Sequence, residues 1–192
     1  SSLCWYCGCN KVVTKDHGRS AKYIKYLARE MALVDELLGD ERAICQLHWG
    51  GGTPTFLSGE EMQTLMDEIH RHFLPVPNAE NSIEIDPRKI ESGTMGFLAE
   101  LGFNRVSIGV QDFNPAVQKA VNRIQSEEET RRAIDEARAN GFRSVNLDLI
   151  YGLPKQTLGG FETTLDRGIG LSPERIALYN YAHLPTVFKP QR

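Results

Sequence analysis

Three of the four cysteines in this chain stand within six residues of one another, in the stretch Cys4-Trp5-Tyr6-Cys7-Gly8-Cys9. The fourth, Cys45, stands apart in an apolar run. Crowded cysteines in a chain with no visible secretory signal are more typical of metal ligation than of disulfides. We therefore predict a metal centre in this stretch and a reducing, cytoplasmic setting.

A second set of chemically capable residues recurs at the ends of predicted strands. Glu84, Gln111, Asp148 and Asn180 each stand near the carboxyl end of a strand. A buried parallel strand is usually a continuous apolar run, so polar residues there need a reason. In a barrel of strands and helices the ligand site lies at this end of the strands. The pattern predicts that the four side chains converge on a polar site, although each of them could instead cap a neighbouring loop.

The run Gly50-Gly51-Gly52-Thr53-Pro54 follows one of these strands. It matches neither a dinucleotide-binding fingerprint nor a phosphate-binding loop, because the required glycine spacing and the Lys-Ser or Lys-Thr pair are absent. Glycines lack a side chain, so a ligand can approach their backbone closely. A tight turn would account for one glycine but poorly for three.

The elements that must position these residues alternate along the chain. Strand-like runs are predicted at 43–49, 82–86, 105–111, 144–151 and 175–181. Helices are predicted from Ser20 as N-cap to Gly39, from a capping box of Ser58 and Glu61, over 94–101, from a capping box of Ser126 and Glu129 to Gly141, and over 161–171. Repeated strand–helix units predict an α/β fold with a parallel sheet.

Composition narrows the function classes. The chain has 192 residues, 41% hydrophobic and 24% charged, with a net charge of -3. This balance gives no electrostatic reason to expect a nucleic acid as partner. No apolar run approaches the length of a membrane span, so we expect none.

Five blocks in order resemble the radical S-adenosylmethionine (radical SAM) superfamily and, within it, the oxygen-independent coproporphyrinogen III oxidases. Cys4-x-x-Cys7, with an aromatic directly before Cys7, resembles the last two cysteines of the superfamily signature C-x3-C-x2-C. The matching blocks are Cys7-Gly8-Cys9-Asn10, the run from Leu47 to Thr55, the run from Gly109 to Asn114, the run from Asp148 to Pro154, and the run from Tyr179 to Pro185. The resemblance covers essentially the whole chain.

The resemblance implies a partial (β/α)6 TIM-like barrel whose first strand is missing, with residues 1–192 as a fragment of the radical SAM core domain. The signature places its first cysteine four residues before Cys4, which falls before Ser1. That ligand and a C-terminal domain are expected to lie outside this sequence, so we expect the piece by itself to be inactive. Cys9 belongs to the family pattern without being a normal ligand, and whether it replaces the missing one is open.

The resemblance also implies the cofactors and their residues. Cys4 and Cys7 would hold a [4Fe-4S] cluster, which leaves one iron open for S-adenosylmethionine (SAM). Gly51 and Glu84 would contact this first molecule. A second SAM beside it would be contacted by Tyr6, Gly52, Thr53, Gln111, Arg123, Asp148 and Ala182.

The implied activity is the oxidative decarboxylation of coproporphyrinogen III to protoporphyrinogen IX in haem and porphyrin biosynthesis. The implied partners are this porphyrinogen and a one-electron donor such as a flavodoxin or ferredoxin, and the protein is expected to be a cytoplasmic monomer. The catalytic residues themselves stay unknown at this stage.

Two other functions remain open from the sequence. A related haem chaperone shares the fold and the cluster motif but binds and delivers haem, and it is expected to lack the cysteine at position 9. A structural zinc site on Cys4, Cys7 and Cys9 is less favourable, because a closed zinc site takes four ligands. Iron–sulfur clusters are brown and zinc is colourless, so colour separates these two metals.

Overall fold

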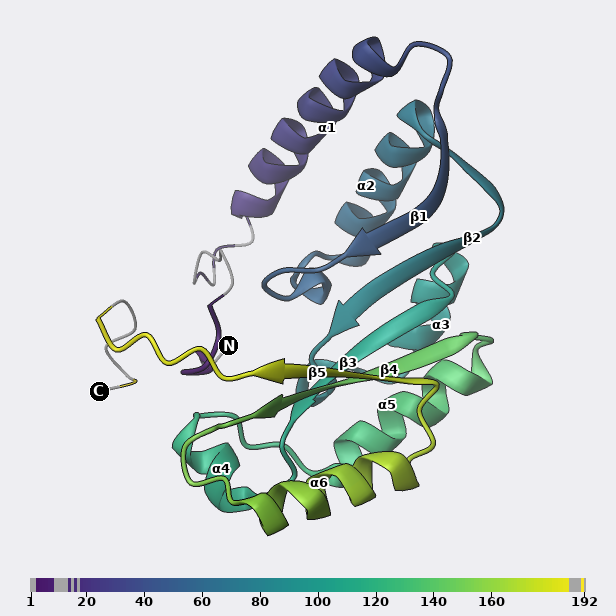
Figure 1. Ribbon diagram of the computed structural model, residues 1–192. Coiled ribbons are helices and arrows are strands. Elements are labelled where there is room, and N and C mark those ends of the chain that lie inside the picture. The colour runs from purple at the N-terminus through teal and green to yellow at the C-terminus, as the bar shows by residue number, and fades with distance from the viewer. Residues whose placement is uncertain (1–2, 9–13, 15, 17, 187–190, 192) are drawn as a thin grey trace.

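Five parallel strands form one sheet in the part of the chain that the structure describes. The computed structural model describes residues 3–8, 14, 16, 18–186 and 191. The strands follow one another in sequence order across the sheet. The sheet curls and stays open between its first and last strands, and the strands point toward the side where residues 3–8 lie (Figure 1). The predicted partial barrel is confirmed. The strands are β1 (Ala43–Trp49), β2 (Leu74–Ile85), β3 (Arg105–Gln111), β4 (Ser144–Tyr151) and β5 (Arg175–Asn180).

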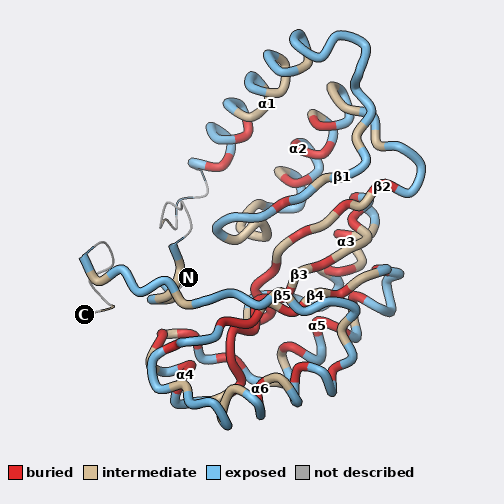
Figure 2. The backbone as a smooth tube through the Cα atoms, in the orientation of Figure 1, coloured by how far each residue is buried: buried red, intermediate tan, exposed pale blue. Residues whose placement is uncertain are grey.

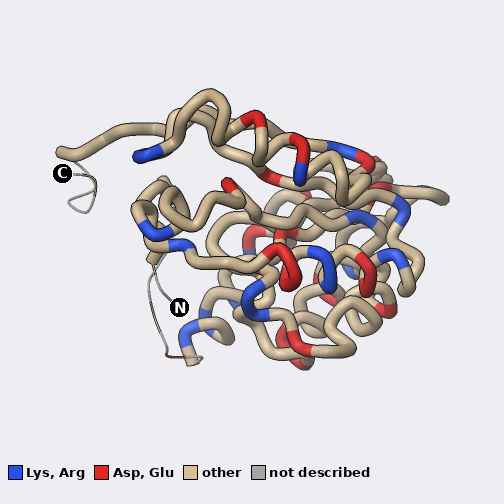
Figure 3. Tube along the Cα trace, turned by 90° about the horizontal axis from the view of Figure 1, so that it is seen from below, with Lys and Arg blue, Asp and Glu red and all other residues tan. Residues whose placement is uncertain are grey.

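Helices cover the convex side of the curled sheet. The two longest pack on each other beside β1, and the others run along the remaining strands (Figure 1). They are α1 (Gly18–Leu38), α2 (Gly59–His72), α3 (Thr94–Glu100), α4 (Pro115–Ala120), α5 (Glu127–Ala139) and α6 (Leu158–Gly170), with short 3-10 turns η1 (Pro54–Phe56) and η2 (Pro87–Lys89). Lysines and arginines alternate with acidic residues along the chain (Figure 3), so the charges are interspersed on the side seen there.

The two faces of the strands differ in polarity because side chains alternate along a strand. Val106, Ile108 and Val110 of β3 are at most 2% exposed and pack under the helices. The corresponding residues of β4, Val145, Leu147 and Leu149, are fully buried. Buried segments therefore concentrate in β2 to β4 and on the sheet-facing sides of the helices (Figure 2).

The opposite face carries polar side chains in register. Glu84 pairs with Ser107, Ser107 with Asn146, and Asn146 with Arg175, so four polar residues form one row across four strands. A second polar row lies two residues earlier along the strands and consists of His48, Ser82, Arg105 and Ser144. The inner face of this half-barrel is thus built for polar contacts, whereas closed barrels usually fill theirs with branched apolar side chains.

Both predicted capping boxes are present. Ser58 accepts from the backbone of Glu61 while the Glu61 carboxylate accepts from the backbone of Ser58, and Ser126 and Glu129 do the same. The predicted N-cap at Ser20 is wrong. α1 begins two residues earlier, and the buried Ser20 hydroxyl donates to the carboxylate of Glu61 in α2 instead.

Other elements also differ from the prediction. β2 begins at Leu74 rather than 82, because its early part pairs with β1 although two prolines interrupt the pattern. α4 was not predicted, since six residues are too few to show helical periodicity. α6 begins at Leu158 rather than 161, where Thr157 caps a first turn whose two glycines are weak helix formers.

Matched leucine substitutions test this assignment of core and surface. Leu98 in α3 is fully buried in the main core, and Leu37 in α1 is 87% exposed. We expect Leu98→Ala to lower the free energy of unfolding by about 2–5 kcal/mol, because the cavity left behind is only partly filled. Leu37→Ala should change it by about 0.5 kcal/mol or less. Urea unfolding followed by circular dichroism measures both, and equal effects would contradict the assignment.

Candidate active site

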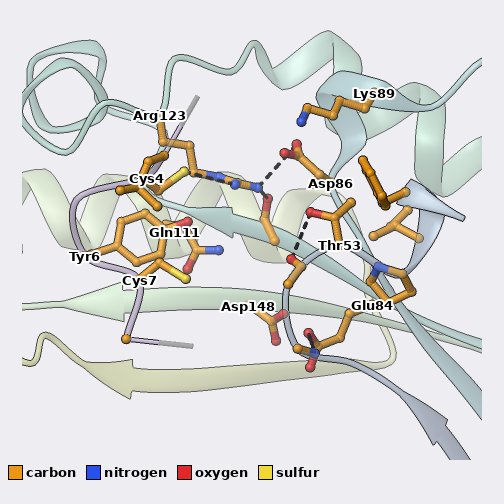
Figure 4. A pocket seen from close by; sticks show the side chains of 18 of the residues that line it. Cys4, Tyr6, Cys7, Thr53, Glu84, Asp86, Lys89, Gln111, Arg123 and Asp148 are labelled. Carbon is orange, nitrogen blue, oxygen red and sulfur yellow. Dashed lines mark hydrogen bonds and ion pairs between the residues drawn. The ribbon is translucent and has the colours of Figure 1, made fainter. Parts of the chain in front are cut away.

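A cavity of about 590 Å³ opens at the carboxyl ends of the strands. Its wall includes the N-terminal segment Leu3 to Gly8, which we call the cysteine loop, the glycine run after β1, and the ends of β2 to β5. The turn after β2 and Arg123, from the loop after α4, also line it. Its volume lies within the range of small-molecule sites. Figure 4 shows both described cysteines of the loop facing the polar strand-end side chains across this space.

The cysteine loop is fixed to the protein through its backbone. The Trp5 N–H donates to the carbonyl of Val121 at 2.9 Å, and the Asn122 side chain donates to the carbonyl of Leu3 at 2.9 Å. Tyr6 packs against a small buried apolar cluster that includes Val121. Burial raises the pKa of Tyr6 well above its ordinary value, so its phenol stays neutral. Trp5 thus anchors the loop through its backbone, and Tyr6 anchors it by packing and lines the cavity.

Arg123 is a buried residue of this wall and not a surface arginine. Its side chain is 8% exposed and donates from Nη2 to the carbonyl of Gly109 at 2.5 Å. The same nitrogen lies 3.6 Å from a carboxylate oxygen of Asp86, and Nη1 lies 3.7 Å from the sulfur of Cys4. Its Nε is buried without a partner in the described part of the chain. Arg123 therefore ties the cysteine loop to the ends of β2 and β3.

Asp86 holds a fixed negative charge beside Arg123. Burial opposes its ionisation, but hydrogen bonds from Arg88 and the charge of Arg123 outweigh burial and hold the pKa of Asp86 below its usual value. The carboxylate therefore remains ionised at neutral pH. It balances part of the positive charge that two arginines bring to this wall.

The glycine run brings backbone to the carboxylate of Glu84. The Gly51 N–H donates to Glu84 Oε2 at 3.2 Å, and Gly51 has a φ of 103°, which favours glycine. A Cβ on Gly50 would lie 2.6 Å from His48 Nε2 and 2.8 Å from Glu84 Oε1, so a side chain there would displace the ends of both residues. Conformation favours glycine at position 51 and the position of His48 and Glu84 favours it at position 50, which a single tight turn does not account for.

Glu84 has a second neighbour that the sequence did not indicate. His48 Nε2 lies 3.3 Å from Glu84 Oε1, and His48 Nδ1 lies 2.7 Å from the hydroxyl of Ser82. A neutral ring with its proton on Nε2 donates to the Glu84 carboxylate and accepts at Nδ1 from the Ser82 hydroxyl. His48 thereby orients Glu84 toward the mouth of the cavity.

Asp148 is the most perturbed acid of the site. Ser107 donates to its Oδ2 at 2.9 Å and Asn146 donates to its Oδ1 at 2.8 Å. Burial raises the pKa of Asp148 to about 6, and the negative charge of Glu84 adds to this, although both hydrogen bonds favour the carboxylate. A cationic or hydroxyl-bearing ligand between Glu84 and Asp148 would relieve this cost.

Gln111 reaches the cavity through an irregular strand end. Its φ is 72°, and the pairing of β3 with β4 shifts between Gly109 and Gln111. A Cβ on Gly109 would lie 2.9 Å from both Arg123 Nη2 and Gln111 Nε2, so the glycine makes room for both side chains.

The structure brings together all the site residues that the family resemblance implies, except Ala182. The cavity is lined by Cys4, Tyr6, Cys7, Gly51, Gly52, Thr53, Glu84, Gln111, Arg123 and Asp148. Ala182 is not among the lining residues, and its described contact is a hydrogen bond that its carbonyl accepts from Gln191.

The predicted convergence of four strand-end residues is wrong for Asn180. Register places Ala177 beside Asp148, so the residue two positions on, Tyr179, shares the face of Asp148 and lines the cavity. Asn180 points the other way. Counting in twos from the register of β4 would have found Tyr179.

Sequence reasoning also missed the turn after β2. Asp86 and Lys89 line the cavity, and Arg88 contacts both Asp86 and Cys4. The run Asp86-Pro87-Arg88-Lys89 directly follows a strand end, as the other site residues do. Its place directly after a strand end was the sequence feature that could have identified these residues as part of the site.

Cys4 and Cys7 suit a metal centre by chemistry and place. Neither is in a disulfide, both line the cavity, and the sulfur of Cys4 has arginine donors beside it. No group of three metal-binding side chains is found among the described residues. Cys9, which the zinc hypothesis needs, lies outside them. Two thiols therefore fit part of an iron–sulfur ligand set.

Comparison with protein families decides the membership. The model of the radical SAM superfamily matches residues 1–168. The chain belongs to the radical SAM superfamily. Membership implies a [4Fe-4S] cluster and SAM as cofactors, in agreement with the two cysteines at the cavity, and it favours the cluster over a zinc site.

Curated relatives of this radical SAM chain show which group within the superfamily it resembles. It is 54% identical over 194 residues to the oxygen-independent coproporphyrinogen III oxidase of Pseudomonas aeruginosa and 48% identical over 190 residues to that of Escherichia coli. These matches cover 100% and 99% of this chain but 42% and 41% of those proteins. The chain thus spans about two fifths of the length of these curated relatives. The predicted resemblance to this group of oxidases is confirmed, and the haem chaperone alternative is not supported.

Solved structures agree with the fold. The coproporphyrinogen III oxidase of Escherichia coli, described as a radical SAM enzyme, matches with a TM-score of 0.92 and 48% identity over 100% of this chain and 44% of that one. A radical SAM methyltransferase from Kitasatospora setae matches with a TM-score of 0.62 and 14% identity over 84% of this chain and 31% of its own, which shows the fold alone.

Among the described residues, no helix combines the length and the apolar character that crossing a membrane requires.

The raised pKa of Asp148 predicts a pH-dependent cost to stability. Its pKa rises from 3.8 to about 6 on folding, so the folded chain holds more protons between these values. Stability from this group is therefore full at low pH and is lost as the pH rises through about 6. Between pH 5 and pH 7.5 wild type should lose about 1.4 kcal/mol relative to Asp148→Asn. Urea unfolding of both proteins at the two pH values measures this, and an unchanged difference would contradict it.

Proposed function

We propose that the protein to which this chain belongs catalyses the oxidative decarboxylation of coproporphyrinogen III to protoporphyrinogen IX. The observation that carries the proposal is the meeting of Cys4 and Cys7 with Glu84 and Asp148 at one cavity. High identity to coproporphyrinogen III oxidases over the whole chain supports the choice of reaction. Residues 1–192 are proposed to form the radical SAM core domain of that protein, and other segments complete it.

Cys4 and Cys7 are the proposed cluster ligands, together with a cysteine four residues upstream of Cys4. Three thiolates leave one iron of a four-iron cluster without a protein ligand. A cluster held by these cysteines would supply the single electron that the cleavage of SAM to a 5′-deoxyadenosyl radical requires. The protein contributes binding, orientation and exclusion of water. Tyr6 supports this role because it covers the cavity from the side of the loop.

The strand ends are proposed to bind SAM through charge and hydrogen bonds. Glu84 and Asp148 accept hydrogen bonds from an ammonium or from ribose hydroxyls, and Arg123 offers its guanidinium to a carboxylate. Gly51 presents its backbone beside Glu84, which supports its assignment to the first SAM molecule. A second SAM is proposed beside the first, contacted by Tyr6, Gly52, Thr53, Gln111, Arg123, Asp148 and Ala182.

The net reaction converts two propionate side chains into vinyl groups. Each propionate loses one hydrogen atom from its β-carbon, one electron and carbon dioxide. The hydrogen atom is taken up by the adenosyl fragment, and the electron passes to an acceptor. We propose a flavodoxin or ferredoxin as the donor that reduces the cluster, and a monomer as the working form. A cytoplasmic location is proposed because free cysteines persist in a reducing compartment.

Anaerobic reconstitution with iron and sulfide tests the proposal. The chain extended upstream through the missing cysteine should turn brown and, once reduced, give an electron paramagnetic resonance signal that shifts when SAM is added. Cys7→Ser in the extended chain should lose the signal, whereas Cys45→Ser, remote from the site, should keep it. Incubation of the complete protein with coproporphyrinogen III, SAM, a reductant and an electron acceptor should then yield protoporphyrinogen IX, 5′-deoxyadenosine and carbon dioxide.

Two other outcomes would contradict parts of the proposed function. A colourless extended chain that binds zinc would contradict the radical SAM chemistry. A brown, SAM-responsive protein that leaves coproporphyrinogen III unchanged would contradict the substrate alone.

A further inference from the structure

Two guanidinium groups converge on the sulfur of Cys4. Arg123 Nη1 lies 3.7 Å from it, and Arg88 Nη2 lies 3.8 Å from it. Arg123 comes from the loop after α4 and Arg88 from the turn η2, so the two donors reach the sulfur from different elements. Figure 4 shows Arg123 between Cys4 and Asp86. Arg88 is not among the residues that the family resemblance assigns to cluster or SAM.

Arg88 is held in place by Asp86. Its Nε donates to Asp86 Oδ1 at 2.8 Å, and its Nη2 donates to Asp86 Oδ2 at 2.6 Å. The backbone N–H of Arg88 also donates to Asp86 Oδ1 at 3.2 Å. The two side chains are only 14% and 11% exposed. This bidentate grip aims the remaining N–H of Nη2 at Cys4, a geometry that a lysine cannot reproduce.

Arg88, Arg123 and Asp86 together carry a net positive charge beside Cys4. The two arginines bring two positive charges, and Asp86 brings one negative charge. Unbalanced charge is costly in a partly buried site. An iron–sulfur cluster held by Cys4 would bring negative charge, and the Cys4 sulfur is placed to accept both hydrogen bonds, so the surroundings suit Cys4 as a cluster ligand.

Hydrogen bonds to cluster sulfurs and nearby positive charge make a cluster easier to reduce, because reduction adds one negative charge. We propose that Arg88, braced by Asp86, is a positioning residue that donates to the Cys4 sulfur and thereby raises the reduction potential of the cluster. This inference rests on the proposed function, since it requires a cluster on Cys4. The electron itself comes from an external one-electron donor protein.

The test is a redox titration of the reconstituted, upstream-extended chain, followed by electron paramagnetic resonance. Arg88→Gln should lower the equilibrium constant for one-electron reduction about tenfold, which is about 59 mV toward more negative potential. Arg88→Lys keeps the charge without the fork and should fall between Arg88→Gln and wild type. It also serves as the second variant if Arg88→Gln does not fold.

Lys89 provides the matched control. It is the next residue, it is exposed, and no contact between its ammonium group and Cys4 is found within the described residues. Lys89→Gln removes the same charge from the same turn. Although Lys89 also lines the cavity, its substitution should shift the potential by less than a third of the shift in Arg88→Gln, because Lys89 is exposed to solvent and makes no described hydrogen bond to the Cys4 sulfur.

The outcomes separate this inference from the proposed function. A SAM-responsive cluster whose potential is unchanged in Arg88→Gln and Arg88→Lys would overturn the role of Arg88 and leave the function intact. Equal shifts in Arg88→Gln and Lys89→Gln would also overturn it, because a general field would then account for the effect. If the upstream-extended wild-type chain holds no cluster after reconstitution, both the role of Arg88 and the proposed function are overturned.

Discussion

The candidate site depends on the docking of the cysteine loop onto the turn that follows α4. A short segment far from the sheet in sequence is held there by the hydrogen bond from Trp5 to Val121 and by the burial of Tyr6. Asn122, in the left-handed region with a φ of 55°, directs its amide to the carbonyl of Leu3. Without this contact Cys4 would not meet Arg123, and the cavity would lose one wall.

The turn that holds the cysteine loop is itself fixed by a buried network of polar side chains around Asp112. Asp112 is 1% exposed and accepts from Gln156 and Thr164, while its carbonyl accepts from Gln118. The carbonyl of Gln118 accepts the backbone N–H of Arg123 at 2.8 Å. Satisfied buried networks of this kind specify one arrangement of their members. This network around Asp112 thus links the core of the fold to the position of Arg123 beside Cys4.

The sheet and most of the site could be predicted from the sequence, because side chains alternate between the two faces of a strand. Apolar residues of β3 and β4 marked the buried face, so Asp148 had to face the cavity. The prediction failed at Asn180 because the exposed strand β5 lacks that alternation. It failed at Arg88 because an arginine two residues after an aspartate is typical of an ordinary capped turn, and its contact with Cys4 spans 84 positions. The role of Ala182 rests on resemblance alone, since a small side chain leaves no pattern.

The central claim is that the cysteine loop and the strand ends form one site for a cluster and SAM. Anaerobic crystallography of the upstream-extended chain, reconstituted and soaked with SAM, tests it most directly. The account predicts cluster density bonded to Cys4 and Cys7, with SAM extending from it into the cavity beside Glu84 and Asp148. A cluster bonded elsewhere, or SAM bound away from these strand ends, would contradict it.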